Sequence, residues 1–170
     1  KAARNDLAAA QLMLGRVYAT GTGLAKDYAK AAVWYRKAAE QGLAAAQSNL
    51  GRLYKKGLGV SQDLVEAGKW YLRAAEQGYA RAQNSLGWAY LKGRGVPRDY
   101  ARAREWFEKA AEQGYARAQS SFGYMYEKGL GVPQDYAEAV KWYRKAAEHG
   151  NKNAIKKLTR LKRSHPDIVK

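Results

Sequence analysis

The stretch at residues 93–100, GRGVPRDY, has the residue types of a phosphate-binding loop. Glycines let a backbone approach an anion closely, and the start of a helix favours negative charge. Arg94 and Arg98 would add positive charge, and Asp99 would supply a carboxylate for acid–base chemistry. Either chemistry would make the stretch a ligand-binding or catalytic loop, provided that it occurs once in the chain.

The stretch occurs four times. Related segments begin at Gly21, Gly57, Gly93 and Gly129, so the period is 36 residues without an insertion. The segments LGRVY, LGRLY, LGWAY and FGYMY precede them at the same step, and WYRKAAEQG and its variants follow. A catalytic loop is normally present once, whereas a scaffold element recurs in every unit. The glycine loop is therefore predicted to be architectural.

Other candidates for chemistry are scarce. His165 lies in the tripeptide HPD, but only three residues follow Asp167, which indicates a coincidental match to the co-chaperone signature. His149 replaces a glutamine of the repeat, and we expect it to be exposed to solvent. The sequence has no cysteine, no Ser/His/Asp set, no metal-ligand cluster and no P-loop. We expect a protein that is not an enzyme, with no cofactor, no metal and no small-molecule substrate.

Each repeat is predicted to form two helices. In the third repeat the first helix covers about residues 79–92, with apolar residues at four-residue steps. Gly93 suits the left-handed position that ends a helix, and Asp99 suits the N-cap of the second helix. The second helix stops at Gly114. These two-helix units must hold every other side chain in place.

The residues carry a family resemblance. The pattern AxAQxxLGxxY, then GxGVxxD, then WYxKAAEQG resembles the Sel-one-like repeat, a relative of the tetratricopeptide repeat. The resemblance implies an all-α, right-handed α/α superhelix that acts as a protein-interaction scaffold or adaptor. Bacterial members are associated with secretion, virulence, the envelope and immunity to toxic effectors. Unlike the cysteine-rich members, this chain has no disulfides to staple its helix pairs.

The repeats cover about residues 7–42, 43–78, 79–114 and 115–150 of one array that spans residues 1–170. Thr159 and Lys162 stand where the repeat has glycine and tyrosine, so residues 151–163 are predicted to be a capping helix, followed by a basic tail at 164–170. Ala2 and Ala3 are in register with a second helix, and we expect the natural protein to extend upstream, with more repeats or a leader.

The charge leaves two classes of function open. The formal net charge is +16, from 31 Lys and Arg against 15 Asp and Glu. This excess favours an acidic protein partner or, as the alternative, nucleic acid or an anionic surface. Nucleic-acid binding would need exposed aromatic side chains for stacking, whereas Trp34, Trp70, Trp106 and Trp142 recur at one repeat position and are predicted to pack. No segment is apolar enough to span a bilayer.

The resemblance also indicates where a partner would bind. In related arrays the first helix of each pair lines a concave groove, at fixed positions around the repeat glycine. The predicted groove residues of this chain are Arg16, Arg52, Lys55, Lys56, Arg81, Asn84, Trp88, Lys92, Arg117, Tyr124 and Lys128.

The capping helix would add Lys156, Arg160 and Arg163 to this groove, and Glu127 would be its one acid. We expect Trp88 and Tyr124 to stand exposed at its centre and to anchor an acidic protein or peptide. Ordinary solvated helix faces are the alternative interpretation. The protein is otherwise expected to be a monomer, in a bacterial periplasm or envelope first and the cytoplasm second.

Overall fold

The computed structural model describes residues 2–168, with side chains from residue 6 onward. The described residues form nine helices and no strand. Their bounds are α1 Ala2–Thr20, α2 Tyr28–Glu40, α3 Ala44–Lys56, α4 Leu64–Glu76, α5 Ala80–Lys92, α6 Tyr100–Glu112, α7 Ala116–Lys128, α8 Tyr136–Glu148 and α9 Lys152–Ser164.

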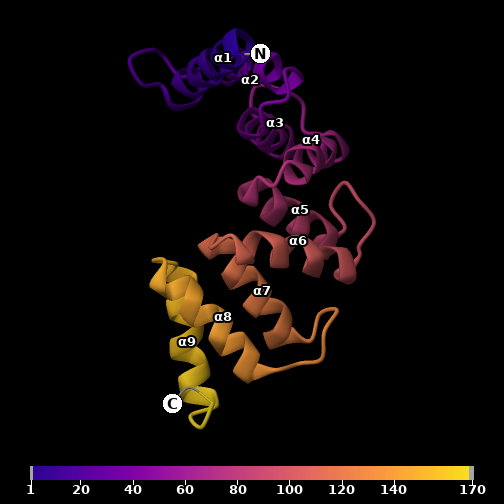
Figure 1. Cartoon of the computed structure of the whole chain (residues 1–170), viewed down its shortest axis with the longest axis vertical. Helices are drawn as coiled ribbons and strands as arrows, with labels where there is room; N and C mark the ends of the chain where they lie inside the picture. Colours follow the sequence, from indigo (N-terminus) through magenta and orange to yellow (C-terminus); the bar gives the residue numbers. More distant parts are fainter. Residues whose placement is uncertain (1, 169–170) are drawn as a thin grey trace.

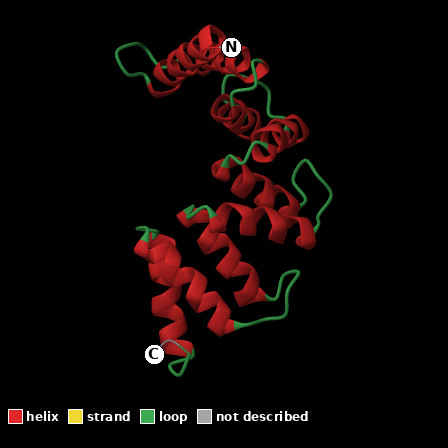
Figure 2. Ribbon diagram, in the orientation of Figure 1, coloured by secondary structure: helices red, strands yellow, loops and turns green. Residues whose placement is uncertain are grey.

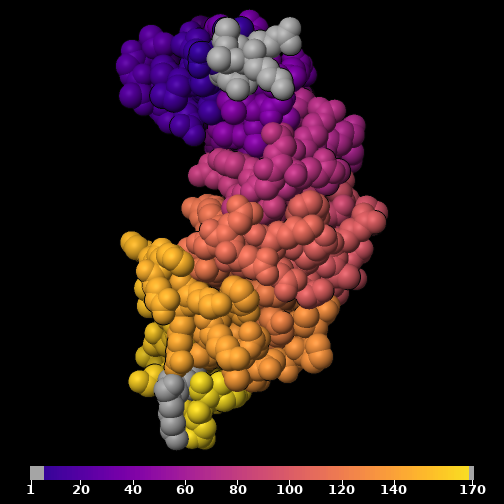
Figure 3. Space-filling view, viewed as in Figure 1, coloured from indigo at the N-terminus to yellow at the C-terminus, as the bar shows by residue number. Residues whose placement is uncertain are grey.

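The helices stack as antiparallel pairs into a curved column, with the two chain ends at opposite ends (Figure 1). Each helix packs against the next one in the chain, and α5 also contacts α7 across one repeat. Long loops join the helices within a pair, and short turns join one pair to the next (Figure 2). The prediction of an all-α solenoid with a 36-residue period is confirmed. One side of the column is hollowed in outline (Figure 3).

The glycine loop ends one helix and starts the next. Gly93 ends α5 in the left-handed conformation, with φ of 62°. The Asp99 carboxylate caps α6 by accepting a hydrogen bond of 2.9 Å from the backbone N–H of Arg102. The aspartates at Asp27, Asp63 and Asp135 make the same bond in their own repeats. A carboxylate therefore occupies the helix start at which a phosphate would have to bind.

The second glycine of the loop permits a close contact between repeats. Gly95 has φ of 75°, and a Cβ placed on it would lie only 1.9 Å from the backbone oxygen of Leu64. The loop of one repeat therefore rests on the start of the second helix of the repeat before it. This contact explains the second glycine without any bound anion.

The core between paired helices is built from small residues against aromatic rings. Gly87 of α5 faces the ring of Phe107 on α6, which is fully buried. A Cβ at Gly87 would approach two ring carbons to 2.7 Å. Gly15, Gly51 and Gly123 face tyrosine rings at the equivalent place in the other repeats. The recurring glycine thus sets how closely the two helices of a pair can approach.

Glutamines link successive repeats in a series that the sequence interpretation missed. Gln113 donates to the side-chain oxygen of Gln83 at 2.7 Å, and Gln83 donates in turn to the backbone oxygen of Ala75. The pairs Gln41–Gln11 and Gln77–Gln47 repeat the first bond. His149 takes the glutamine's place at the end of the series, 3.1 Å from Gln119. The constant spacing of 30 residues was the signal available in the sequence.

The two ends of the column differ from its middle. In α9 the side chains of Ala154 and Leu161 are buried, while Thr159 and Lys162 are exposed, as suits a last helix that has only one neighbour. At the other end α1 runs unbroken from Ala2, so the expectation that Ala2 belongs to a separate second helix is wrong. The last two residues of the basic tail lie outside the described part of the chain.

Candidate functional site

A wide hollow lies across the C-terminal half of the array. It has a volume of about 1110 Å³. It is lined by α5 and α7, which are the first helices of the third and fourth repeats, by α9 and by the turn before α9. The described residues that line it include six cations and no carboxylate. The six are Lys92, Arg117, Lys152, Lys156, Lys157 and Arg160. We call this hollow the basic groove.

Two aromatic side chains form the floor of the basic groove. The rings of Trp88 and Tyr124 stack with centroids 5.9 Å apart and planes at 29°. The Trp88 indole donates a 2.9 Å hydrogen bond to the hydroxyl of Ser121, which lies 3.0 Å from the side-chain oxygen of Asn84. An edge contact with Phe107 holds the indole from below. The expectation that both rings stand exposed is wrong, because each is half-buried against its neighbours.

Cations lie over both rings of this floor. The Lys157 ammonium is 5.1 Å from the centroid of Tyr124, and the Lys92 ammonium is 5.9 Å from that of Trp88. Such contacts are attractive because the ring face carries negative charge. The groove therefore presents an ordered aromatic surface that is bordered by positive charge.

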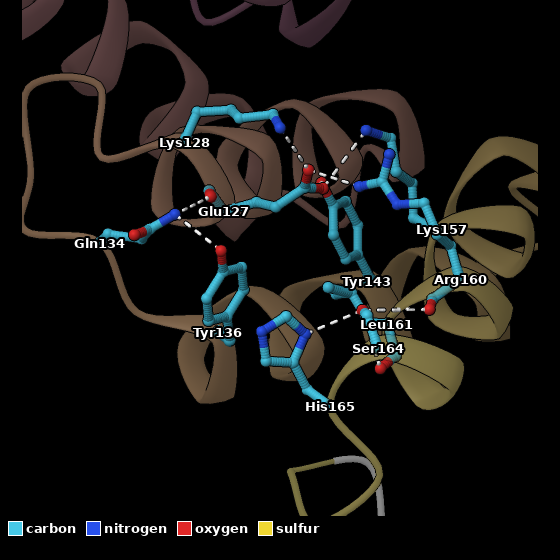
Figure 4. A network of polar contacts seen from close by, with 10 residues as sticks. All are labelled: Glu127, Lys128, Gln134, Tyr136, Tyr143, Lys157, Arg160, Leu161, Ser164 and His165. Atoms are coloured by element: carbon cyan, nitrogen blue, oxygen red, sulfur yellow. Dashed lines mark hydrogen bonds and ion pairs between the residues drawn. The ribbon is translucent and has the colours of Figure 1, made fainter.

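Glu127 does not offer negative charge to the groove, contrary to expectation. Its side chain is 2% exposed, and the Tyr143 hydroxyl donates to it at 2.7 Å (Figure 4). Lys157 reaches the carboxylate at 3.2 Å and Arg160 at 2.5 Å, both from α9, while Lys128 lies at 3.3 Å. Burial by itself would raise the pKa of Glu127, but the Tyr143 hydrogen bond and the Lys157 charge lower it to about 2. The ionised carboxylate thus ties α7 to α9.

His165 of the HPD tripeptide has a packing role. Its ring lies against Tyr136 with centroids 4.2 Å apart, and its Nδ1 is 2.8 Å from the hydroxyl of Ser164 (Figure 4). The Tyr136 hydroxyl accepts a hydrogen bond from Gln134 in the preceding loop. These contacts attach the segment after α9 to the start of α8.

The structure brings together part of the predicted groove. Five of the predicted residues line the basic groove: Asn84, Trp88, Lys92, Arg117 and Tyr124. Lys55 lines a smaller hollow that also includes Trp88 and Lys92. Five others line neither hollow: Arg16, Arg52, Arg81, Lys56 and Lys128. Of the cap-helix residues, Lys156 and Arg160 line the basic groove and Arg163 does not.

Sequence reasoning missed several lining residues, notably Ser121, Lys152 and Lys157. Ser121 lies 33 residues after its indole partner Trp88 and Lys157 lies 30 residues after Glu127. Sequence spacings of 30 and 33 residues separate positions that face each other across neighbouring first helices. A search at these two spacings would have found Ser121 and Lys157.

On the second helices, the repeated tryptophans are covered by cations. Lys37 lies 4.5 Å from the Trp34 ring, Arg73 lies 4.6 Å from Trp70, Lys109 lies 4.8 Å from Trp106 and Lys145 lies 4.3 Å from Trp142. Trp70 is buried and the other three are half-buried. In each case the cationic side chain three residues after the tryptophan therefore occupies a ring face that a nucleic-acid base would need for stacking.

The described residues contain no cluster of three or more histidine, cysteine, aspartate or glutamate side chains placed to hold a metal ion. None of the described helices combines the length and the apolar character needed to cross a membrane.

Paired helices stacked at a constant step, with a groove across their first members, define an α/α solenoid. Four consecutive matches to the Sel1 repeat model cover residues 8–43, 44–79, 80–115 and 116–151. The chain therefore belongs to the Sel1 repeat family. No curated protein matches the chain significantly.

Solved structures agree with this assignment. The chain is 48% identical to c5321, a protective antigen of uropathogenic Escherichia coli with an SLR fold, over 86% of this chain and 32% of that one, with a TM-score of 0.81. A Sel1 repeat protein of Oxalobacter formigenes is 43% identical over 88% of this chain and 60% of its own, with a TM-score of 0.82.

A third solved structure, cysteine-rich protein B of Helicobacter pylori, is 26% identical over 76% of this chain and 93% of its own, with a TM-score of 0.60. The chain spans less than two thirds of the length of the first two relatives.

Proposed function

We propose that the protein is a non-catalytic scaffold that binds an acidic segment of another protein in the basic groove. The observation that carries the proposal is the lining of that groove, in which six cations surround an aromatic floor and none of the described lining residues is a carboxylate. A chain with a net charge of +16 would attract such a partner from a distance. Membership of a family of interaction repeats supports the same function.

The groove's parts would act differently on binding. Trp88 and Tyr124 are already held by stacking and by the Ser121 hydrogen bond, so little side-chain entropy would be lost when a partner covers them. Aromatic side chains at the centre of an interface commonly supply most of the binding energy. Exposed cations such as Arg117 and Lys156 would chiefly accelerate association, and this effect would weaken as salt is added.

The most suitable role is that of an adaptor or immunity protein in the bacterial envelope or in virulence. Support comes from the kind of relative that the chain resembles, since one of them is a protective antigen. Nucleic-acid binding is the second candidate, favoured by the net charge. It is ranked lower because cations already lie over the tryptophan faces.

The proposal is tested by isolating a partner with the intact protein and measuring its affinity for variants. Trp88→Ala should weaken binding by about 2 kcal/mol or more, roughly thirtyfold, and leave the helical content unchanged. Lys37→Glu, on the face away from the groove, is the control and should bind within twofold of the parent. A partner that binds Trp88→Ala normally and loses affinity for Lys37→Glu would place the interface on the second helices. Tight, sequence-selective binding to one RNA would favour the second candidate instead.

A further inference from the structure

A smaller hollow of about 210 Å³ lies beside the basic groove, between α4 and the ends of α3 and α5. Its lining includes three cations, Lys55, Lys92 and Arg94, and none of the described lining residues is acidic. Its volume is more than ten times the roughly 10–15 Å³ that one water molecule needs. We call it the Lys55 pocket.

The repeat supplies an internal comparison for this pocket. Moving back by two repeats from Glu127 leads to Lys55, and moving back from Tyr143 leads to Tyr71. At the later site, a carboxylate sits at the junction of three helices and is held by a tyrosine hydroxyl and three cations. At the earlier site the tyrosine is kept, the carboxylate is replaced by an ammonium, and a cavity remains.

Lys55 is held in an unfavourable setting. Its ammonium donates no hydrogen bond to a described side chain and forms no ion pair with a described carboxylate. Burial, then the charges of Arg94 and Lys56, lower the pKa of Lys55. Desolvating a cation without a counter-charge costs free energy, which an incoming anion would recover.

The remaining walls suit an acidic side chain better than a free mineral anion. Tyr71 contributes a hydroxyl group, while the Ser85 hydroxyl already donates to the backbone oxygen of Arg81 at 2.9 Å. Leu64, Ala67 and the indole of Trp88 contribute apolar surface. An acidic side chain has a carboxylate for the Tyr71 hydroxyl and the cations and a methylene stem for the apolar wall. Gly68 also lines the pocket, where other repeats have alanine, arginine or valine, so the space is particular to this repeat.

We infer that the Lys55 pocket receives the carboxylate of a glutamate side chain from the partner segment that lies in the basic groove. Trp88 and Lys92 line both hollows, so one bound segment can reach from the groove floor into the pocket. This assignment rests on the proposed function and adds to it a single acidic anchor residue. The protein's own Glu127 shows how such a carboxylate is held.

The test uses the intact ¹⁵N-labelled protein and capped glutamate, N-acetyl-glutamate amide, at constant ionic strength. We expect saturable shifts of the Trp88 indole N–H resonance and of the Ser85 and Lys92 amides. N-acetyl-glutamine amide, which has the same shape without the charge, should give no saturable shift. In Lys55→Met the dissociation constant should rise at least tenfold, and in the control Lys37→Met, which removes a cation remote from the pocket, it should stay within twofold.

A second variant tests the same site without a ligand. Lys55→Glu should place a carboxylate in the pocket as Glu127 does at the later site. It should abolish the response to capped glutamate and raise the thermal midpoint above that of Lys55→Met.

The inference is overturned by equal binding of capped glutamine, by saturation with inorganic phosphate but not with capped glutamate, or by an unchanged affinity in Lys55→Met. It is also overturned by a Lys55→Glu midpoint no higher than that of Lys55→Met. If capped glutamate saturates the pocket but groove variants leave partner binding intact, the proposed function fails and the pocket stands. If partner binding depends on Trp88 but is unchanged in Lys55→Met, the proposed function stands and the inference about the pocket fails.

Discussion

Two glycines in neighbouring helices should respond in opposite ways to the same substitution. Gly87 in α5 lies against a buried ring, whereas Gly68 in α4 has room for a Cβ without a close approach. A Cβ at Gly68 would meet Val96 and the Gly95 oxygen at 3.6 and 3.7 Å, which is ordinary contact. The pair therefore separates the packing role of a helical glycine from its intrinsic cost to a helix.

The expected magnitudes follow from these contacts. Replacing glycine by alanine inside a helix stabilises it by about 1 kcal/mol through backbone entropy. Gly68→Ala should show this gain. At Gly87 the new Cβ would come within 2.7 Å of two carbons of Phe107, a ring with no exposed surface to move into. Overpacking of this kind costs about 3 kcal/mol at the upper end of its usual range, so Gly87→Ala should be destabilised by about 2 kcal/mol net.

The assay is urea unfolding followed by circular dichroism, with thermal melting as a second measurement. A loss of about 2 kcal/mol corresponds to a fall of roughly 4–8 °C in the melting temperature of a chain of this length. Gly51→Ala should lie between the other two variants, because its Cβ would meet Tyr71 at 3.0 Å. If Gly87→Ala is as stable as Gly68→Ala, the assigned close approach of α5 to α6 is wrong.

Three further perturbations test other contacts. The depressed pKa of Glu127 means that its ionised form stabilises the fold above about pH 4.5 and that this stability is lost as the pH falls towards 2. Acid titration of urea stability should therefore show an extra loss on the order of 2–3 kcal/mol in the parent that Glu127→Gln lacks, and parallel curves would contradict the pairing. Asp99→Ala should cost about 1 kcal/mol through the lost helix cap, and an unaltered urea midpoint would count against that role. Gln113→Leu should cost about 1–2 kcal/mol because the buried oxygen of Gln83 loses its donor, and a neutral result would show that the glutamine series is dispensable.

Much of the fold could be predicted because each repeat places its residues in the same surroundings. The period predicted the helix pairs, and the positions of Gly93 and Asp99 predicted how they end and begin. The helix end at Gly93 and the cap made by Asp99 each involve residues that are close together in the chain. The second glycine, Gly95, was harder to explain from sequence because the atom it approaches belongs to the preceding repeat.

The candidate site was only partly predictable because its charges are not periodic. Glu127 was expected to be the one acid of the groove, but α9 supplies Lys157 and Arg160 to it, and α9 does not follow the repeat pattern. The half-buried state of Trp88 depends on Ser121, which lies 33 positions away, at a position where the other repeats have Met13, Asn49 and Ser85. Only contacts between repeats could show which predicted cations share one hollow.

The binding role of the basic groove is tested most directly by a matched pair of charge reversals. Arg117 and Arg81 stand at the same position of successive repeats and are both exposed, but only Arg117 lines the basic groove. The affinity of an isolated acidic partner should fall at least tenfold for Arg117→Glu, with a reduced salt dependence, and by less than threefold for Arg81→Glu. Equal affinity of the two variants for that partner would contradict the assignment of the groove as the binding site.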